Sequence, residues 1–138
     1  MTLDNLNTIR LKHFYDADGV LIPIELSSLP FIPKRVFIVK DVPALEERGN
    51  HAHYETQQVL ICLKGKITVK LFDGKSLANF ILDEGNSIFV DKLIWDSQVF
   101  MTGNDVLLSI CSTEYNPLDY INNLEEFVEI LSNKTNVE

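Results

Sequence analysis

The 138-residue sequence carries 12 lysines and arginines against 20 aspartates and glutamates, a formal net charge of −8, and 46% of its residues are hydrophobic. This length predicts a single domain, residues 1–138, with enough apolar residues for one core. The net charge argues against partners such as nucleic acid or an anionic membrane, because the field of the protein would repel them.

The charge is distributed unevenly along the chain. Residues 114–138 carry six acidic residues and one lysine, which accounts for −5 of the total. Between Lys34 and Lys70, seven basic residues stand against four acidic ones. We therefore expect this central segment to hold a small anionic ligand, although the protein as a whole is acidic.

The N-terminal segment MTLDNLNTIRLK has no apolar signal core. No run approaches the ~18 apolar residues that a membrane span needs. The two cysteines, Cys62 and Cys111, lie in apolar runs without metal-ligand spacing, which is typical of buried thiols in a reducing compartment. These features predict a cytoplasmic protein without a membrane partner.

Short runs rich in Val, Ile, Leu and Phe recur at the spacing typical of an all-β sandwich or barrel. They cover approximately residues 8–13, 20–26, 35–40, 57–63, 66–72, 77–82, 87–90, 93–101 and 105–112. Within 66–72 the apolar residues alternate with polar ones, so this strand is expected to have one dry face. Glycines at 19, 65, 74 and 85 favour tight turns, and neighbouring strands are therefore predicted to be antiparallel.

After Pro117 the hydrophobic period becomes that of a helix. The apolar residues at this spacing are Leu124, Phe127, Val128 and Leu131. Asn123 is expected to cap the helix N-terminus. We predict an amphipathic helix that packs on the outside of the β body, with residues 133–138 as a frayed tail.

Residues 47–65 contain the pattern that points to chemistry. His51 and His53 are two residues apart, so on a strand both imidazoles point to the same face, and Gln57 shares their parity if the strand is unbroken. A bare pair of this kind is more often structural than functional, but the flanking glycines and short strands favour a site. The sequence therefore predicts that two imidazoles and an amide share one interior.

The spacing from Gly49 through the histidine pair to Gly65, followed by the segment 85–90, resembles the two motifs of the cupin double-stranded β-helix, a jelly-roll barrel. In metal-dependent cupins the further ligands are a glutamate four residues after the second histidine and a third histidine in the second motif. Here these positions are Gln57 and Asp96, which suit iron, manganese or zinc poorly. The resemblance therefore implies an all-β jelly-roll barrel with a C-terminal helix, and we expect no metal or other cofactor.

A narrower resemblance covers about residues 9–130. Segments 34–37, 48–53, 58–65 and 119–121, together with Trp95, are similar to the sugar 3,4-ketoisomerases, and Arg48-Gly-x-His-Ala-His53 is the most specific string. These are metal-independent cupins that move the ketone of dTDP-4-keto-6-deoxyglucose from C4 to C3, in the biosynthesis of dTDP-3-amino sugars. The resemblance implies the same activity, and a dTDP-linked keto sugar as the substrate of this chain.

The chemistry suits imidazole, whose ordinary pKa allows it both to remove the C3 proton and to return a proton to C4 through an enediol. The resemblance implies that the second histidine, His53, is the base, with His51 polarising the substrate or moving protons between O3 and O4. Asp96 is expected either to orient an imidazole, to relay a proton, or to form an ordinary hydrogen bond at the barrel mouth.

The diphosphate of dTDP favours guanidinium partners. Arg48 is the first candidate because it lies three residues before His51, followed by Arg35 and Lys34, and then by Lys64. The lysines are equally expected as ordinary surface charges. Trp95 is a candidate for stacking on thymine or the sugar, with core packing as the alternative.

Two positions depart from the family pattern. Relatives commonly have Asp-x-Arg-Gly where this chain has Asp16-Ala17-Asp18-Gly19, and often a tyrosine where it has Phe37. The changes leave the product open between galacto and gluco configurations at C4, because Asp18 is expected near the sugar. Family members often exchange an N-terminal strand in a homodimer, so residues 8–13 are a candidate for exchange, with Tyr15 or Asp16 lining the partner's site.

Two other functions remain possible at this point. A 3- or 5-epimerase of dTDP-keto sugars uses a related fold and a histidine base, but normally needs a tyrosine acid opposite it. A non-catalytic sugar-nucleotide-binding cupin is favoured only by the missing arginine and tyrosine.

Overall fold

The computed structural model describes residues 3–137, and strands dominate it. The strands are β1 (Ile9–Arg10), β2 (Phe14–Asp16), β3 (Gly19–Leu21), β4 (Arg35–Lys40), β5 (Glu46–His53), β6 (Gln58–Lys64), β7 (Lys66–Phe72), β8 (Leu77–Asp83), β9 (Asn86–Val90), β10 (Trp95–Phe100), β11 (Val106–Cys111) and β12 (Tyr120–Ile121). One α-helix, α1 (Leu124–Val137), follows them, and short 3₁₀ turns occupy Leu3–Asn5, Leu26–Ser28 and Pro117–Asp119.

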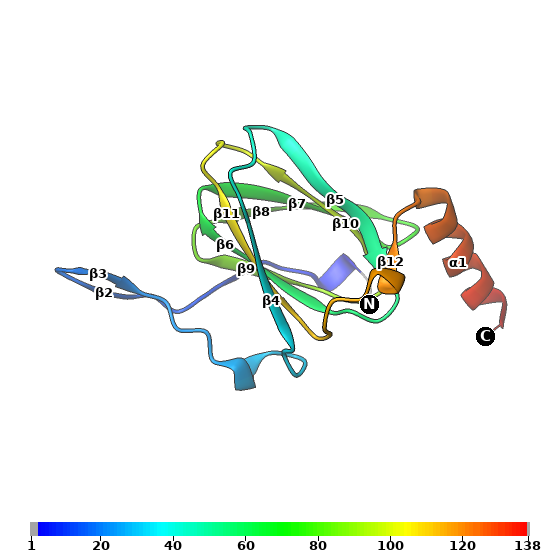
Figure 1. Ribbon diagram of the computed structural model, residues 1–138, viewed down its shortest axis with the longest axis horizontal. Coiled ribbons are helices and arrows are strands. Elements are labelled where there is room, and N and C mark those ends of the chain that lie inside the picture. Colours follow the sequence, from blue (N-terminus) through cyan, green and yellow to red (C-terminus); the bar gives the residue numbers. More distant parts are fainter. Residues whose placement is uncertain (1–2, 138) are drawn as a thin grey trace.

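Two five-stranded antiparallel sheets form the body, in the orders β1-β9-β6-β11-β4 and β12-β5-β10-β7-β8. Figure 1 shows these sheets facing each other, with the β2–β3 hairpin projecting from one side and α1 from the other. The predicted all-β jelly roll with a C-terminal helix is confirmed.

The core fills the space between the two sheets. On β7 the side chains of Ile67, Val69 and Leu71 point inward and are fully buried, which confirms the dry face predicted for 66–72. Cys62 and Cys111 are free thiols in this interior, also as predicted. Burial of each large aliphatic side chain contributes roughly 1.5–3 kcal/mol to stability.

The apolar pattern of the sequence did not mark β5 as a strand. Its first five residues are exposed and polar, so no hydrophobic run marked it as a strand. It forms because its backbone pairs with β10 on one side and, near its end, with β12 on the other. Backbone pairing, which residue type reports poorly, thus decides this strand.

Helix α1 begins where its cap predicts. The side-chain Oδ1 of Asn123 accepts a hydrogen bond from the backbone N–H of Glu126 at 2.9 Å. Phe127 is fully buried against Trp95 and Phe72 on the outer face of the second sheet, whereas Leu124 and Val128 of the predicted stripe are exposed. The helix extends to Val137, and Glu138 lies outside the described residues; that residues 133–138 fray stays a prediction.

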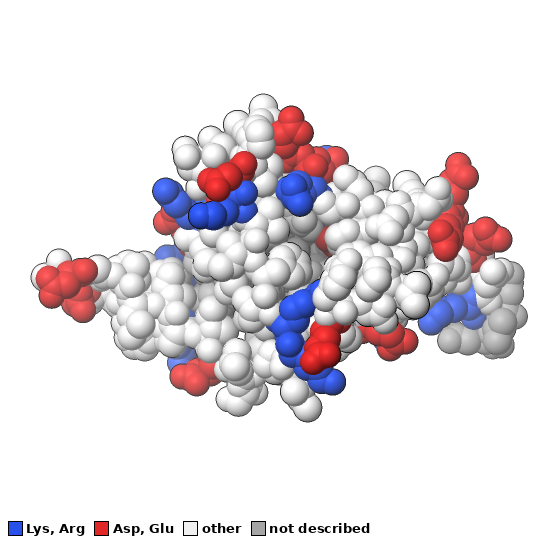
Figure 2. Space-filling model, viewed as in Figure 1, with Lys and Arg blue, Asp and Glu red and all other residues white. Residues whose placement is uncertain are grey.

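Figure 2 shows acidic side chains at the tip of the β2–β3 hairpin and on α1, and basic and acidic side chains interspersed over the central body. No helix among residues 3–137 has the length and apolar character that a membrane span requires.

Candidate active site

A cavity of about 440 Å³ opens between the two sheets. This volume lies in the range of ordinary small-molecule sites. Strands β4, β5, β6, β10 and β11 and the 115–120 segment contribute its wall. The polar and charged side chains on this wall are those of Arg35, Arg48, His51, Gln58, Asp96, Gln98, Tyr115 and Tyr120.

A β-bulge on β5 turns His51 toward this cavity. Asp96 pairs with His51, but the next residue of β10, Ser97, pairs with Gly49, so Asn50 is the extra residue. Gly49 has φ +95°, and a Cβ there would lie 3.1 Å from the Ser97 Cα. Glycine is therefore required at this point, and the bulge sets His51 beside Asp96 on the cavity wall.

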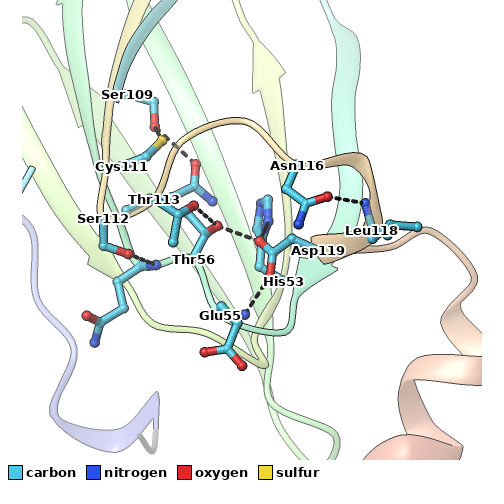
Figure 3. Close-up of polar contacts among 12 residues, drawn as sticks. His53, Glu55, Thr56, Ser109, Cys111, Ser112, Thr113, Asn116, Leu118 and Asp119 are labelled. Atoms are coloured by element: carbon cyan, nitrogen blue, oxygen red, sulfur yellow. Dashed lines mark hydrogen bonds and ion pairs between the residues drawn. The ribbon is translucent and has the colours of Figure 1, made fainter. Parts of the chain in front are cut away.

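His53 lies behind His51, with the two ring centroids 4.9 Å apart. It is only 4% exposed, and it is not part of the cavity wall. Its Nδ1 donates a hydrogen bond to Oδ2 of Asp119 at 2.9 Å (Figure 3). A carboxylate can only accept, so Nδ1 carries the proton and Nε2 of His53 is free to accept one.

Asp119 is held by three donors. Besides His53 it accepts the backbone N–H of Glu55 at 2.7 Å and the hydroxyl of Thr56, which in turn contacts Thr113 (Figure 3). Burial raises the pKa of Asp119, but the hydrogen bonds from Thr56, Glu55 and His53 outweigh it and lower the pKa below its usual value. Asp119 is therefore a carboxylate that fixes the orientation of the His53 ring.

Both imidazoles are neutral near pH 7. Burial lowers the pKa of His51 to about 4, and the neighbouring His53 adds to the effect. Burial also lowers the pKa of His53; Asp119 opposes this shift, whereas the positive charge of Arg35 adds to it. Each ring can therefore accept a proton.

Aromatic rings surround one end of the site. The Tyr120 ring centroid lies 5.2 Å from that of His51 and 4.5 Å from that of His53. The Arg35 guanidinium carbon lies 5.6 Å from the Tyr115 ring centroid and 5.7 Å from that of Phe37. These rings position the guanidinium without neutralising it, so its charge remains available for an anion.

Asp96 is the buried carboxyl group of the wall, with only 1% of its surface exposed. Its Oδ1 accepts a hydrogen bond from Nε2 of Gln98 at 2.6 Å. Its Oδ2 is buried and makes no hydrogen bond within the described part of the chain. Burial raises the pKa of Asp96 to about 7, against a smaller lowering by Gln98.

Of the residues singled out in the sequence, the structure brings Arg35, Arg48, His51 and Asp96 onto the cavity wall, with His53 directly behind. Gln57 does not join them. The strand breaks between β5 and β6, and the Gln57 amide donates to Oδ1 of Asp91 at 3.0 Å. The condition of an unbroken strand, on which the shared face of Gln57 depended, is therefore not met, and Gln58 lies on the wall instead.

Trp95 also lies outside the cavity. It precedes Asp96 on β10, so its side chain points to the other face of the sheet, where it packs on Phe127. This position agrees with the core-packing alternative, and stacking of Trp95 on thymine or the sugar stays a prediction.

The remaining candidates are exposed and away from the wall. Lys34 precedes β4, and Lys64 ends β6 six residues beyond Gln58. Tyr15 and Asp18 belong to the projecting β2–β3 hairpin (Figure 1). Within a single chain, therefore, none of these four side chains lines the cavity.

The two positions that would complete a cupin metal site do not fit that role. The Gln57 amide is bound to Asp91, and Asp96 is bound to Gln98. Within residues 3–137, no three His, Cys, Asp or Glu side chains are arranged to hold a metal ion.

Four residues of the site were not predicted as such: Gln58, Gln98, Asp119 and Tyr120. Asp119 and Tyr120 stood in a segment of family resemblance but were given no role. Gln58 begins the otherwise apolar run QVLICL, and a polar residue in such a run was the available signal. Gln98 lies two residues after Asp96 and shares its face.

A family model and a curated relative both match nearly the whole chain. The family model FdtA (WxcM-like, C-terminal) matches residues 4–132. The chain is 33% identical over 132 residues to the TDP-4-oxo-6-deoxy-alpha-D-glucose-3,4-oxoisomerase of Aneurinibacillus thermoaerophilus, with 94% of each chain covered.

Solved structures similar to this chain include a sugar 3,4-ketoisomerase and an epimerase. The sugar 3,4-ketoisomerase QdtA of Thermoanaerobacterium thermosaccharolyticum, solved with TDP, has a TM-score of 0.88 and 30% identity over 96% of this chain and 98% of its own. A histidine-to-asparagine variant of that enzyme was solved with TDP-4-keto-6-deoxyglucose. The RmlC epimerase of Mycobacterium tuberculosis, at 16% identity and a TM-score of 0.76 over 87% of this chain and 69% of its own, shares the fold.

Proposed function

This chain belongs to the FdtA family (WxcM-like, C-terminal), and we propose on that premise that it is a sugar 3,4-ketoisomerase acting on TDP-4-keto-6-deoxyglucose, the dTDP-linked sugar. The observation that carries the proposal is the pair of neutral imidazoles, His51 and His53, at a cavity that also presents two arginines. Imidazoles serve proton transfer at carbon, and guanidinium groups serve a diphosphate.

His51 is proposed as the base that removes the C3 proton, because it lies on the wall and is neutral. The C–H electron pair then forms the C3=C4 double bond while O4 is protonated, which gives the enediol. Return of the proton to C4 and loss of the O3 proton complete the shift. His53 and Asp119 support the ring from behind, so this order of roles reverses the one implied by the family resemblance.

Incubation with TDP-4-keto-6-deoxyglucose in D₂O, followed by NMR, tests the activity. We expect the carbonyl to move from C4 to C3, with deuterium at C4 to the extent that the protonated base exchanges with solvent before it returns its proton. Deuterium exchange at C5, or inversion without carbonyl migration, would instead identify an epimerase, an alternative favoured by the tyrosine beside the histidines. Binding without any change would overturn both enzymatic functions.

Arg35 and Arg48 are proposed to bind the diphosphate. Both line the cavity, and neither makes a salt bridge within the described part of the chain. We expect Arg35→Gln and Arg48→Gln each to weaken TDP binding by about 10- to 100-fold, since a charge-assisted hydrogen bond contributes roughly 1.5–3 kcal/mol.

Isothermal titration calorimetry with TDP at low and high salt measures this effect, which salt should reduce. Lys64→Gln is the matched control, because Lys64 is an exposed cation away from the cavity. If Lys64→Gln weakened TDP binding as much as the arginine variants do, the effect would come from the net charge of the protein and not from contacts of Arg35 and Arg48 with the diphosphate.

A homodimer is proposed from the β2–β3 hairpin. Phe14, Tyr15, Val20 and Leu21 are 50–69% exposed on a two-stranded ribbon that projects from the body. Such a ribbon is marginally stable alone. A second copy of the chain would cover these apolar groups and bring Tyr15 and Asp18 to the partner's cavity. The exchanged segment is then 14–21, since β1 pairs with β9 of its own chain.

Analytical ultracentrifugation tests this assembly. The double variant Phe14→Ser/Leu21→Ser is expected to shift the protein from dimer to monomer, because it removes apolar area from the interface. Leu77→Ser serves as the control, since Leu77 is 80% exposed on β8 and lies outside the hairpin. A monomeric wild-type protein would contradict the proposal.

A cytoplasmic location is proposed from the two buried free cysteines, which suit a reducing compartment. Cell fractionation against a cytoplasmic marker enzyme tests it, and recovery with the envelope fraction would contradict it.

A further inference from the structure

We propose that Asp96 carries the second proton of the isomerisation: as a carboxylic acid it gives a proton to O4 of the sugar, and as a carboxylate it then takes the proton of O3. The inference rests on the proposed function, because it assigns a group to the oxygen-to-oxygen transfer that any 3,4-ketone shift requires. His51 then moves only the carbon-bound proton.

Asp96 lies beside His51 on the cavity wall. The two residues face each other on the antiparallel strands β10 and β5, so their side chains lie on the same side of the sheet at neighbouring positions. Both line the cavity. A sugar that presents its C3 hydrogen to His51 presents O3 and O4, on adjacent carbons, to the next group along the wall, and that group is Asp96.

The carboxyl group of Asp96 has one hydrogen-bonded oxygen and one without a partner among the described residues. Gln98 donates to Oδ1, which makes Oδ1 the accepting oxygen and leaves Oδ2 to hold the proton. Oδ2 is buried and has no partner among the described residues. A buried polar atom left without a partner is destabilising, and here a substrate hydroxyl or carbonyl oxygen would supply the partner.

The surroundings of Asp96 favour its protonated form up to about neutral pH. Burial raises its pKa to about 7, against the smaller effect of Gln98. On β7 the residue opposite is the apolar Leu71. The titratable or charged groups that share the cavity are His51 and Arg48 from β5, Arg35 from β4, and Tyr115 and Tyr120 from the following segment. His51 is neutral, and a bound diphosphate would engage the two arginines, so no free cation remains among these groups to favour the carboxylate.

The steps balance. First the C3–H bond breaks, its proton goes to His51, its electron pair forms C3=C4, and O4 takes the proton of Asp96. The enediol is then flanked by an imidazolium and a carboxylate. Next the O3 proton goes to Asp96 as C3=O3 forms, and C4 takes the proton of His51. Both groups return to their starting states, and their charges attract each other only in the intermediate, where this attraction assists catalysis.

The Asp96→Asn variant tests the proposal. Asparagine keeps the size of the side chain and can form hydrogen bonds, but it cannot release a proton. We expect kcat to fall by about 10²- to 10⁴-fold, the usual contribution of general acid–base catalysis. The KM and the TDP affinity should stay within about threefold. The exposed Asp83→Asn on β8 is the matched control and should leave kcat unchanged.

Two measurements do not depend on the variant being active. The infrared spectrum of the wild type at pH 5 should show a protonated carboxyl band that disappears as pH rises through about 7 and is missing in Asp96→Asn. For kcat, the alkaline decline of the wild type should move to higher pH in Gln98→Met, which removes the donor that lowers the pKa of Asp96.

The outcomes separate this proposal from the proposed function. If the wild type does not move the ketone, the proposed function fails. If the wild type is active but Asp96→Asn retains kcat within about threefold, or if the carboxyl band is absent at pH 5, the role of Asp96 is overturned while the activity stands.

Discussion

Replacement of His51 by asparagine is expected to lower kcat by about 10³-fold or more while TDP affinity stays within about threefold. His51 is the imidazole on the cavity wall, and the bulge at Asn50 directs it there. Asparagine retains polarity but accepts no proton near neutral pH, so the loss falls on the chemical step. Stopped-assay kinetics with TDP-4-keto-6-deoxyglucose, together with TDP titration, measures the two quantities separately.

His53→Asn is the comparison that assigns the roles of the two histidines. If His51 is the base, His51→Asn loses solvent exchange of the C3 hydrogen, whereas His53→Asn keeps detectable exchange at a reduced rate. The opposite pattern in D₂O would return the base to His53, as the family resemblance implies. Equal loss in both variants would mean that the two rings act as a single coupled unit.

The pH dependence adds a further check on His51. Because burial lowers its pKa to about 4, the ring is already neutral at pH 5 and accepts a proton throughout the range above it. We expect kcat/KM to remain high down to about pH 5 and to fall below it, as His51 becomes protonated in the free enzyme. A decline centred near pH 6.5 would show an unperturbed imidazole instead.

The Asp119→Asn variant is expected to lower kcat by about 10²-fold or more with little change in KM. The carboxylate holds the Nδ1 proton of His53, whereas an amide can donate to Nδ1 and force the proton onto Nε2. His53 would then lose Nε2 as its proton-accepting nitrogen. Asp119 is thus a positioning residue, and steady-state kinetics that separate kcat from KM provide the test.

The control for Asp119 must separate catalysis from backbone support, because Asp119 also binds the Glu55 N–H and the Thr56 hydroxyl. Asp73→Asn is suitable: Asp73 accepts the backbone N–H groups of Lys75 and Ser76 in the β7–β8 turn, outside the cavity. It should leave kcat unchanged. A loss of activity in Asp73→Asn as large as that in Asp119→Asn would indicate a merely structural role for both carboxylates.

Stability should follow pH through the same carboxylate. The hydrogen bonds of Asp119 lower its folded-state pKa, so its stabilisation is present above the unfolded pKa and is lost as pH falls through the folded value. Asp96 has the opposite sign, since its raised pKa makes stability decline as pH rises toward about 7. Thermal melts from pH 3 to 8 should therefore show opposite changes in the two variants. Compared with the wild type, Asp119→Asn should lose a rise of Tm with pH, and Asp96→Asn should lose a fall of Tm with pH.

Local signals predicted much of the β body. The alternation on 66–72 and the Asn123 cap depend on neighbours within a few residues, and both are confirmed. Strand β5 escaped the hydrophobic pattern because its first five residues are exposed, and only pairing with distant β10 defines it.

For single residues of the site, too, the sequence predicted the residue type but not the face of the strand on which the side chain lies. Trp95 and Gln57 were plausible from residue type, yet a change of one position on a strand reverses the face on which a side chain lies. Because of the turn between β5 and β6, Gln58 and not Gln57 lies on the cavity wall. On β10, Trp95 and Asp96 are consecutive, so Trp95 faces the helix and Asp96 faces the cavity. Parity across a break in a strand cannot be read from residue type.

The sequence by itself determined the family, the jelly-roll class and the histidine pair, because these depend on motifs whose residues are close along the chain. Only the tertiary structure decided which imidazole lies on the cavity wall and which lies behind it. It also brought Asp119 to His53 across 66 residues and left Asp96 buried with one oxygen unpartnered. Depth, long-range pairing and desolvation depend on the packing of the two sheets, which no local pattern encodes.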